Sequence, residues 1–448
     1  MLLRCCRMLS GFSGTPVSSR LDAGCDSVRY ARGMAQSALP GTLEVIGPDT
    51  FAANGYPHAA WKRLRQEAPI HWFDLPGGVG FWAITKREDI VWISRQPERF
   101  LNAPRLAIFE EGAPVEGERT LARHLLNMDP PEHASFRGAA SSWFTPRAIQ
   151  RRRPEVQRIA QDLLIEMAGD GGERTGDFVA DFTAPLTLHV LADMLGVPRA
   201  DWRLMFRWTN QIAGASDAEY SSGDDPIRGV EDARHGLFAY FTELAAERRK
   251  HPQDDMVSVL SNASVDGAPM PAFELLSYFL LLVVAGNETT RNAASGGLLA
   301  LIENPGEMHK LRADPGLVPS ATEEIVRWTA PVIQFCRTPI EDVEIRGKRI
   351  RKGESLCLLY PSANRDEDVF ADPDVFRIDR KPNPHLGFGI GEHFCLGANL
   401  ARLELRVIFE ELGRRLESVE LAGPVERMRS SFLGGVKRMP IRYRLRPG

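Results

Sequence analysis

The sequence predicts a mainly α fold with small peripheral β-sheets, built as one large domain. Most segments between loop-forming residues space their apolar residues as helices do, and only short segments alternate as strands do. One segment, Ala272–Glu303, would span a whole domain as a single helix at about 1.5 Å per residue. The chain has 448 residues, of which 43% are hydrophobic, so it can bury a large core. No linker-like composition follows residue 40, and we expect residues 39–448 to form a single domain.

Residues 1–38 differ from the rest in composition. They are rich in Arg, Ser and Gly and lack a long apolar stretch, which predicts a disordered extension rather than a membrane anchor or a secretory signal. An organelle-type transit peptide and a start codon placed too early, with Met34 as the true start, remain alternatives.

The composition also bears on location and partners. No cysteine pair after residue 25 has zinc-finger or redox spacing, which favours a reducing, cytoplasmic setting. The formal charge of −4 argues against nucleic-acid binding, which usually needs a strongly basic face.

The elements are expected in the following order. A hairpin is predicted where Ile70–Phe73 and Phe81–Thr85 flank Pro76-Gly77-Gly78. The helices predicted after it are Glu132–Phe144, Pro154–Met167, Phe182–Leu195, Trp202–Ala213, Val230–Lys250, Ala272–Glu303, Val318–Thr329 and Ala398–Leu416. Loops are expected at Gly169–Gly176, Ser216–Pro226 and Ser264–Pro271, and short strands at Val343–Ile345 and Ser355–Leu359.

The long helix carries a break in its apolar pattern. Its first half, Leu275–Ala285, is apolar nearly all round, as a buried helix is, but it is shorter than the roughly 20 residues of a membrane span. The polar run Gly286–Arg291 follows at once. Polar residues in the middle of a buried helix need partners or a purpose, so this run is a candidate functional segment.

A second candidate segment is Phe388–Gly397, which contains Cys395 and ends where the last predicted helix begins. Its glycines allow a tight backbone against a flat ligand, and the start of a helix favours a thiolate. An inert buried cysteine is the ordinary alternative. A zinc site with His385 and His393 is another, although the chain offers few further ligands at suitable spacing.

The pattern Phe-Gly-x-Gly-x-His-x-Cys-x-Gly at 388–397 resembles the heme-ligand signature of the cytochrome P-450 family. Three further segments resemble the family in the same order, so the resemblance runs from about residue 40 to the end. It implies the P-450 fold, with heme b (iron protoporphyrin IX) buried between the long central helix and the cysteine loop. It also implies that Cys395 is the ligand of the iron, where a thiolate favours cleavage of the O–O bond.

Basic residues match the family's propionate-binding positions. His133 and Arg137 lie one helical turn apart, and such a pair of donors would neutralise heme propionates. Arg337 and His393 match other positions of this kind. Taken singly, each would more often be a solvated charge. Glu324-x-x-Arg327, with Arg377, resembles a structural network of the family.

The polar run of the long helix resembles the family's oxygen-activation motif. The resemblance implies that Gly286 leaves space for dioxygen, that Thr289 holds oxygen and water by hydrogen bonds, and that Glu288 relays protons. The alternative is that Thr289 bonds only the backbone of its own helix.

The Glu288–Thr289 pair favours a dioxygen-dependent monooxygenase. No flavin, nicotinamide or iron–sulfur segment is recognisable in the chain, so the electrons are expected from ferredoxin and ferredoxin reductase. Basic residues that could offer a docking face are Arg151, Arg152, Arg153, Arg402 and Arg406, although a solvated helix face explains them equally well. A peroxide-driven peroxygenase and a non-catalytic heme-binding sensor are the alternative functions.

The resemblance also suggests a substrate class. The positions that would line the pocket are mainly apolar and predict a hydrophobic small molecule: Val283, Val284, Ala285, Val332, Ile333 and parts of Leu106–Val115 and Ala213–Tyr220. The segments 285–292, 397–402 and 432–437 resemble a bacterial group that includes steroid side-chain hydroxylases and is close to terpene hydroxylases. The hypothesis is therefore hydroxylation of an unactivated C–H bond in a steroid (side chain) or a terpenoid.

Overall fold

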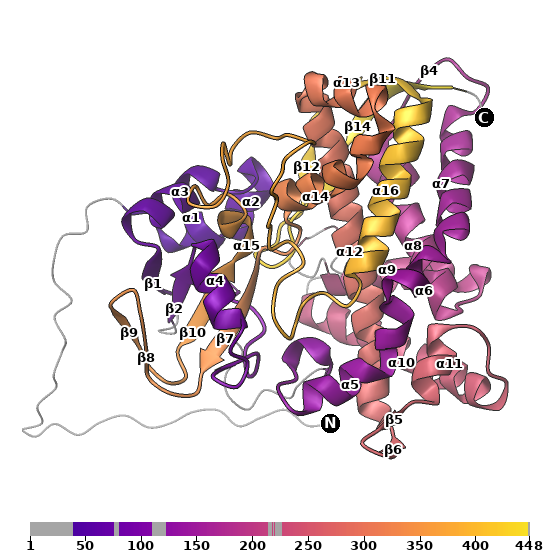
Figure 1. Cartoon of the computed structure of the whole chain (residues 1–448). Helices are drawn as coiled ribbons and strands as arrows, with labels where there is room; N and C mark the ends of the chain where they lie inside the picture. Colours follow the sequence, from indigo (N-terminus) through magenta and orange to yellow (C-terminus); the bar gives the residue numbers. More distant parts are fainter. Residues whose placement is uncertain are drawn as a thin grey trace, which may run out of the picture. The chain divides into compact units, whose positions relative to one another are not determined.

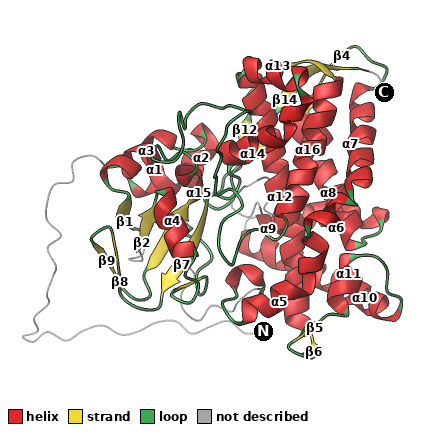
Figure 2. Ribbon diagram, viewed as in Figure 1, coloured by secondary structure: helices red, strands yellow, loops and turns green. Residues whose placement is uncertain are grey.

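Helices make up most of the computed structural model, and a five-stranded sheet with short helices lies beside them (Figures 1 and 2). The structure describes residues 39–75, 80–109, 122–213, 217, 219 and 226–446. The predicted N-terminal extension, residues 1–38, lies outside these ranges, and the domain boundary at residue 39 stays a prediction. The mainly α architecture with small sheets is confirmed.

The long helix α12 (Ala272–Glu303) runs as one uninterrupted element through the helical part. It packs against α8 (Ala184–Leu195), α9 (Trp202–Ala213), α10 (Pro226–Lys250) and α14 (Val318–Thr329), and also against α16 (Ala398–Arg415). By length and composition α12 alone among the described helices could cross a membrane. Its packing against these helices is that of a core helix.

The remaining helices surround this centre or accompany the sheet. Those on the helical side are α5 (Glu132–Ser141), α6 (Pro146–Gln150), α7 (Arg153–Ala168), α11 (Met256–Ser261) and α13 (Pro305–Ala313). Those near the sheet are α1 (Thr42–Ile46), α2 (Pro48–Asn54), α3 (His58–Glu67), α4 (Arg87–Ser94) and α15 (Tyr360–Ala363).

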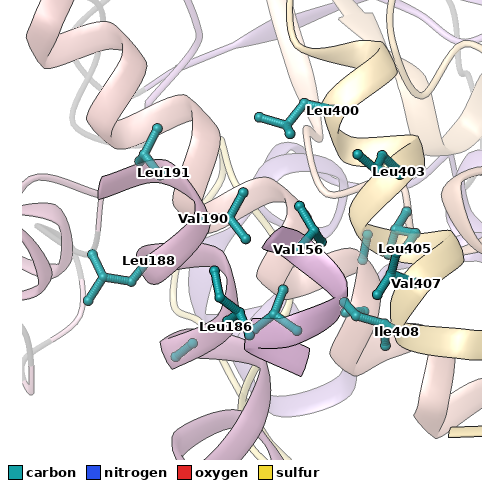
Figure 3. Close-up of a cluster of buried hydrophobic side chains, with 14 of the residues drawn as sticks. Val156, Leu186, Leu188, Val190, Leu191, Leu400, Leu403, Leu405, Val407 and Ile408 are labelled. Atoms are coloured by element: carbon teal, nitrogen blue, oxygen red, sulfur yellow. The ribbon is translucent and has the colours of Figure 1, made fainter. Parts of the chain in front are cut away.

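A cluster of branched side chains joins α7, α8 and α16 (Figure 3). All of its members are at least nine-tenths buried: Val156, Leu186, Leu188, Val190, Leu191, Leu400, Leu403, Leu405, Val407 and Ile408. Burying a side chain of this size contributes about 1.5–3 kcal/mol. The cluster therefore fixes α16, the helix that follows the Cys395 segment, against the helical part.

The main sheet has the strand order β1-β2-β10-β7-β3. The predicted hairpin is confirmed, because β1 (Ile70–Asp74) and β2 (Gly80–Ile84) pair antiparallel with Trp72 opposite Trp82. The residues between the two strands, 76–79, lie outside the described ranges. Strand β10 (Ser355–Leu359), also predicted, pairs parallel with β2 and antiparallel with β7 (Gln334–Pro339).

The other sheets are small. One has the order β11-β14-β4, with bounds Leu416–Leu421, Pro440–Leu445 and Glu173–Asp177. Two-stranded pairs are formed by β8 (Val343–Ile345) with β9 (Lys348–Ile350) and by β12 (Glu426–Arg427) with β13 (Val436–Arg438). Strand β3 (Phe100–Leu101) ends the main sheet beside β7.

Three sequence predictions were wrong in detail. The expected loop Gly169–Gly176 contains most of β4, which pairs antiparallel with β14. The expected loop Ser264–Pro271 contains the hairpin of β5 (Ser264–Val265) and β6 (Ala268–Pro269), whose turn residues Asp266 and Gly267 both have positive φ. The helix expected from Phe182 is preceded by a π-helical turn at Val179–Thr183. The Asp177 side chain caps the start of this turn, where it accepts the N–H groups of Val179 and Ala180.

Candidate active site

The Cys395 segment is a tight loop between α15 and α16. The N–H of Cys395 donates to the Phe388 carbonyl at 2.9 Å, and the N–H of Phe394 donates to Gly391 at 3.1 Å. Gly391 has a φ of 78°, and a Cβ at this position would lie 2.2 Å from the carbonyl oxygen of Ser94 in α4. Only glycine fits such a position, so the loop is held against α4 by a backbone approach.

The sulfur of Cys395 has a mixed electrostatic environment. The residue has exposed surface, yet enough protein surrounds the sulfur to raise the pKa of the thiol by desolvation. The backbone N–H of Gly397 and the charges of Arg137 and Arg402 lower this pKa in turn. As predicted, a backbone N–H next to the start of α16 stabilises the thiolate form of Cys395. Desolvation has the opposite effect and stabilises the neutral thiol.

His385 does not support the zinc alternative. Its Nε2 lies 3.1 Å from Oε2 of Glu323, and its Nδ1 accepts the N–H of Gly387 at 3.1 Å. Both ring nitrogens are therefore engaged away from Cys395.

Four predicted basic residues converge on this loop. The rings of His133, from α5, and His393 lie 4.1 Å apart. Arg137, one turn after His133, donates to the Phe394 carbonyl at 2.7 Å. Arg337, from β7, acts on His393 electrostatically together with Arg137, and desolvation with these charges lowers the pKa of His393 to about 2.

Two nitrogens in this cluster have no partner in the part of the chain that the structure describes. They are Nε2 of His133 and Nε2 of His393, and both are buried. Buried polar atoms are normally hydrogen-bonded, so unpaired imidazole nitrogens beside two arginines suit an anionic group. The donor set fits a heme, whose two propionates need basic partners and whose iron needs an axial ligand such as Cys395.

A carboxylate that sequence reasoning missed joins the cluster. Oε1 of Glu392 lies 2.9 Å from Nδ1 of His133. Glu392 occupies a variable position of the signature, so the motif gave no signal for it. A charged residue directly after Gly391 was the only hint.

The polar run of α12 brings an acid and a base together inside the helix. Glu288 and Arg291, three residues apart, form an ion pair, and their side chains are 1% and 2% exposed. Oε1 of Glu288 has no partner over the described ranges. Burial raises the pKa of Glu288, and Arg291 acts in the opposite direction. Arg291 was not among the predicted site residues.

Thr289 forms a hydrogen bond to the backbone of its own helix, as the alternative reading of the sequence predicted. Its hydroxyl donates to the Ala285 carbonyl, one turn earlier, at 2.8 Å. The oxygen keeps lone pairs that can accept a further hydrogen bond. Ala285 is exposed and shares a helix face with Thr289, so this face carries the accessible surface of α12.

Gly286 lies close to a side chain of α8. A Cβ at Gly286 would lie 3.1 Å from Cδ1 of Leu191 in α8. The glycine allows the close packing of α12 on α8, and its expected role of leaving space for dioxygen stays a prediction.

A structural network supports the loop from behind. Nε and Nη2 of Arg327 donate to the two carboxylate oxygens of Glu324 at 2.7 and 2.8 Å, and both residues are buried. The third member is Arg380, whose Nε lies 3.0 Å from Glu324, and not Arg377 as expected. Arg377 contributes only its backbone N–H, because its guanidinium is turned to Asp372 at the surface.

The expected pocket positions divide into two groups. Val283 and Ile333 are fully packed in hydrophobic clusters. Val284, Ala285 and Val332 keep accessible surface. Residues 110–115 and most of 213–220 lie outside the described residues.

The candidate docking arginines are largely paired. Arg152 contacts Asp193 at 3.4 Å, Arg153 pairs with Glu410, and Arg402 binds Glu323 through two bonds at 2.7 and 2.8 Å. For Arg151 and Arg406 no ion pair is found within the described residues. A hollow of about 460 Å³ between α14 and α16 is lined by Gly316, Pro319, Ser320, Glu323, Arg380, Lys381, Asn383, Arg402 and Arg406.

Known proteins resemble this chain along most of its length. The family model described as Cytochrome P450 matches residues 316–436. A methyl-branched lipid omega-hydroxylase of Mycobacterium tuberculosis is 41% identical over 411 residues, which cover 90% of this chain and 94% of that relative. A steroid C26-monooxygenase of Rhodococcus jostii is 39% identical over 425 residues, which cover 93% of this chain and 88% of the relative. A Mycobacterium marinum cytochrome P450 solved in complex with pseudoionone has a TM-score of 0.83 at 35% identity, and the match covers 91% of this chain and 100% of that one.

Proposed function

The chain belongs to the cytochrome P450 family, and from this premise we propose that it inserts one oxygen atom of O2 into an unactivated C–H bond of a hydrophobic molecule. That it is a P450 monooxygenase follows from its relatives. The observation that carries the rest is the convergence of Cys395, two unpaired histidine nitrogens and two arginines on one loop. A sensor would need the same heme-holding residues, so the acid–alcohol pair of α12 is what favours catalysis.

The proposed cofactor is heme b. When bound, it supplies the activation of dioxygen. Cys395 would hold its iron through the sulfur. Arg137 and Arg337 would neutralise the propionates, since charge-assisted hydrogen bonds are the strong ones. His133 and His393 would bind the propionates by hydrogen bonds.

Glu288 and Thr289 are the proposed proton-handling residues. Thr289 can hold a water through the lone pairs that its bond to Ala285 leaves free. Glu288 is buried and its pKa is raised, so it holds a proton more readily than an ordinary carboxyl group. Because Arg291 already binds this carboxylate, proton transfer requires Glu288 to exchange partners.

The proposed substrate is a steroid side chain or a terpenoid that presents a branched, apolar end. This proposal is supported by two relatives, of which one is named a methyl-branched lipid omega-hydroxylase and the other a steroid C26-monooxygenase. Val284, Ala285 and Val332 offer apolar surface on the side of α12 that remains accessible. A pocket of this kind binds mainly by burying apolar area.

The proposed electron donors are a ferredoxin and its reductase in the cytoplasm. The hollow between α14 and α16 is lined by Lys381, Arg402 and Arg406 among other residues. We propose that it receives acidic side chains of a ferredoxin. Of the arginines expected to form the docking face, Arg151 and Arg406 are the better candidates because the other three are neutralised.

The first test is a substrate titration of the ferric protein followed at the heme Soret band. The panel contains sterols, terpenes, methyl-branched fatty acids and straight-chain fatty acids of equal length. A shift to high spin with branched ends, and none with straight chains, is the expected result. A response to straight chains alone contradicts the branched-end proposal, and a protein that binds no heme contradicts the whole function.

The second test separates the two catalytic routes. Product is expected with ferredoxin, reductase and O2, and it should be slow with hydrogen peroxide alone. Faster product formation with peroxide would assign the protein to the peroxygenases.

A further inference from the structure

His133 is the most deeply buried of the residues that face the Cys395 loop. It is 0% exposed, whereas Glu392, which contacts it, keeps 23% of its side chain exposed. Nδ1 of His133 lies 2.9 Å from Oε1 of Glu392, and Nε2 on the far side of the ring has no partner among the described residues. The ring therefore has one engaged and one available nitrogen.

Elementary hydrogen bonding fixes the proton of this ring. An ionised carboxylate only accepts hydrogen bonds, so Nδ1 of His133 must carry a proton that it donates to Glu392. A neutral imidazole has a single N–H, so Nε2 is then an acceptor. A heme propionate is also only an acceptor. Nε2 can bind it only if the ring takes up a second proton.

We infer that Glu392 is a positioning residue that holds His133 by Nδ1 and favours its doubly protonated form, so that one proton binds together with the heme. This inference rests on the proposed role of His133 at a propionate. Glu392 touches neither cofactor nor substrate in this role and acts through His133 alone.

The charges around His133 fit this assignment. Desolvation is the largest effect on the pKa of His133 and, together with Arg137, lowers this pKa below its usual range. Glu392 and Asp129, which precedes α5, act in the opposite direction and raise it. The ring of His393, 4.1 Å from that of His133, is the other titratable group of the loop beside His133. Of the neighbouring ionisable groups on the elements packed against α5, Asp266 is bonded to Ser135 and Asp255 to Arg248. Burial lowers the pKa of His124 to about 4, so this ring is neutral near pH 7.

The sign of the pH dependence follows. A heme propionate adds a second anion beside His133, so the heme-bound protein has a higher pKa for this ring than the heme-free protein. The gain in heme affinity is fully present below the heme-free pKa and is lost as the pH rises through the heme-bound pKa. Removing the Glu392 charge should lower the heme-bound value.

The experiment measures heme transfer from the ferric holoenzyme to excess apomyoglobin between about pH 5 and pH 9. The wild-type rate should rise with pH through one titration. In Glu392→Gln the midpoint of this rise should move down by about one to two pH units, as the loss of an adjacent opposite charge predicts. In His133→Gln, whose amide donates without titrating, the rate should not follow this titration. Glu392→Asp should restore part of the wild-type midpoint.

Glu344→Gln, an exposed change on β8, is the control and should leave the midpoint unchanged. An unchanged midpoint in Glu392→Gln overturns the inference, and so does a wild-type rate that shows no titration. If Glu392→Gln does not fold, the comparison of wild type with Glu392→Asp decides the question, since an unchanged midpoint in that variant also overturns the inference. A protein without a heme Soret band would instead contradict the proposed function itself.

Discussion

The hydroxyl of Thr289 donates a hydrogen bond to the Ala285 carbonyl and also faces the accessible side of α12. Substitutions can test whether it serves helix structure, water binding or both. Thr289→Ala removes both the bond to Ala285 and the group that can hold water. We expect the variant to consume reducing equivalents and release a larger share of them as peroxide, whereas Thr289→Ser should stay close to wild type. The measurement is the ratio of product and peroxide to NAD(P)H consumed. Unchanged coupling in Thr289→Ala would restrict the hydroxyl to a role in helix structure.

The buried pair of Glu288 and Arg291 makes a stability prediction. Arg291→Met leaves a buried carboxyl group without its counter-charge, which costs about 3 kcal/mol. The pKa of Glu288, already raised by burial, would rise further, so the folded state binds a proton that the unfolded chain lacks near neutral pH. The loss of stability should therefore be largest at neutral pH and should vanish below about pH 4.3.

Thermal unfolding of the holoenzyme at several pH values measures this loss. Glu288→Gln combined with Arg291→Met should recover much of the stability, because no buried charge then remains. An equal loss at all pH values would mean that the packing of Arg291, and not its charge, is what matters.

At the scale of single elements, the Cys395 loop depends on a glycine that touches α4. Gly391→Ala would place a Cβ 2.2 Å from the Ser94 carbonyl at a positive φ, so the loop must move. We expect reduced heme content, measured as the ratio of Soret to protein absorbance. Gly413→Ala in α16 is the matched control, since its Cβ meets nothing within 4 Å. This control should be neutral or slightly stabilising, because alanine favours a helix by up to about 1 kcal/mol.

The elements also show how far sequence reasoning reaches. Helices α9 and α14, with strong apolar periodicity, and the long apolar helix α12 have the predicted bounds. Strand β4 was missed because its pairing with β14 is set by a partner more than 250 residues away. The β5–β6 hairpin was missed although Asp266-Gly267 is a favoured hairpin turn, since its strands have only two residues each.

The candidate site was predictable where residue type and spacing define the chemistry. Cys395, His133, Arg137, Arg337 and His393 lie in one region of the structure, although their roles stay proposals. Arg377 was predicted in the position that Arg380 occupies. The sequence does not show which of these two arginines turns its guanidinium inward. Glu392 contacts His133, and Arg291 contacts Glu288. Neither contact corresponds to a motif, so the sequence did not predict them.

At the scale of the whole molecule, the electron donor must recognise a surface. Arg406→Glu reverses a charge at the hollow between α14 and α16. We expect heme reduction by ferredoxin to slow several-fold at low ionic strength and the difference to shrink in high salt, since such steering is screened. Lys250→Glu, on α10, changes the net charge equally and should have little effect. Stopped-flow reduction measures both rates, and equal slowing by the two variants would indicate a net-charge effect alone.

The segment from residue 364 to 397 contains no helix or strand, yet it ends in the loop that carries Cys395. Its order comes from side chains: Arg327 donates to the carbonyls of Asn364, Pro373 and Val375, and Arg380 donates to those of Ala371 and Asp372. Glu324 holds both arginines. Cofactor retention and helix content are thus separable properties of this chain. A change confined to this one carboxylate would release the heme from a protein whose circular dichroism still reports a folded helical bundle.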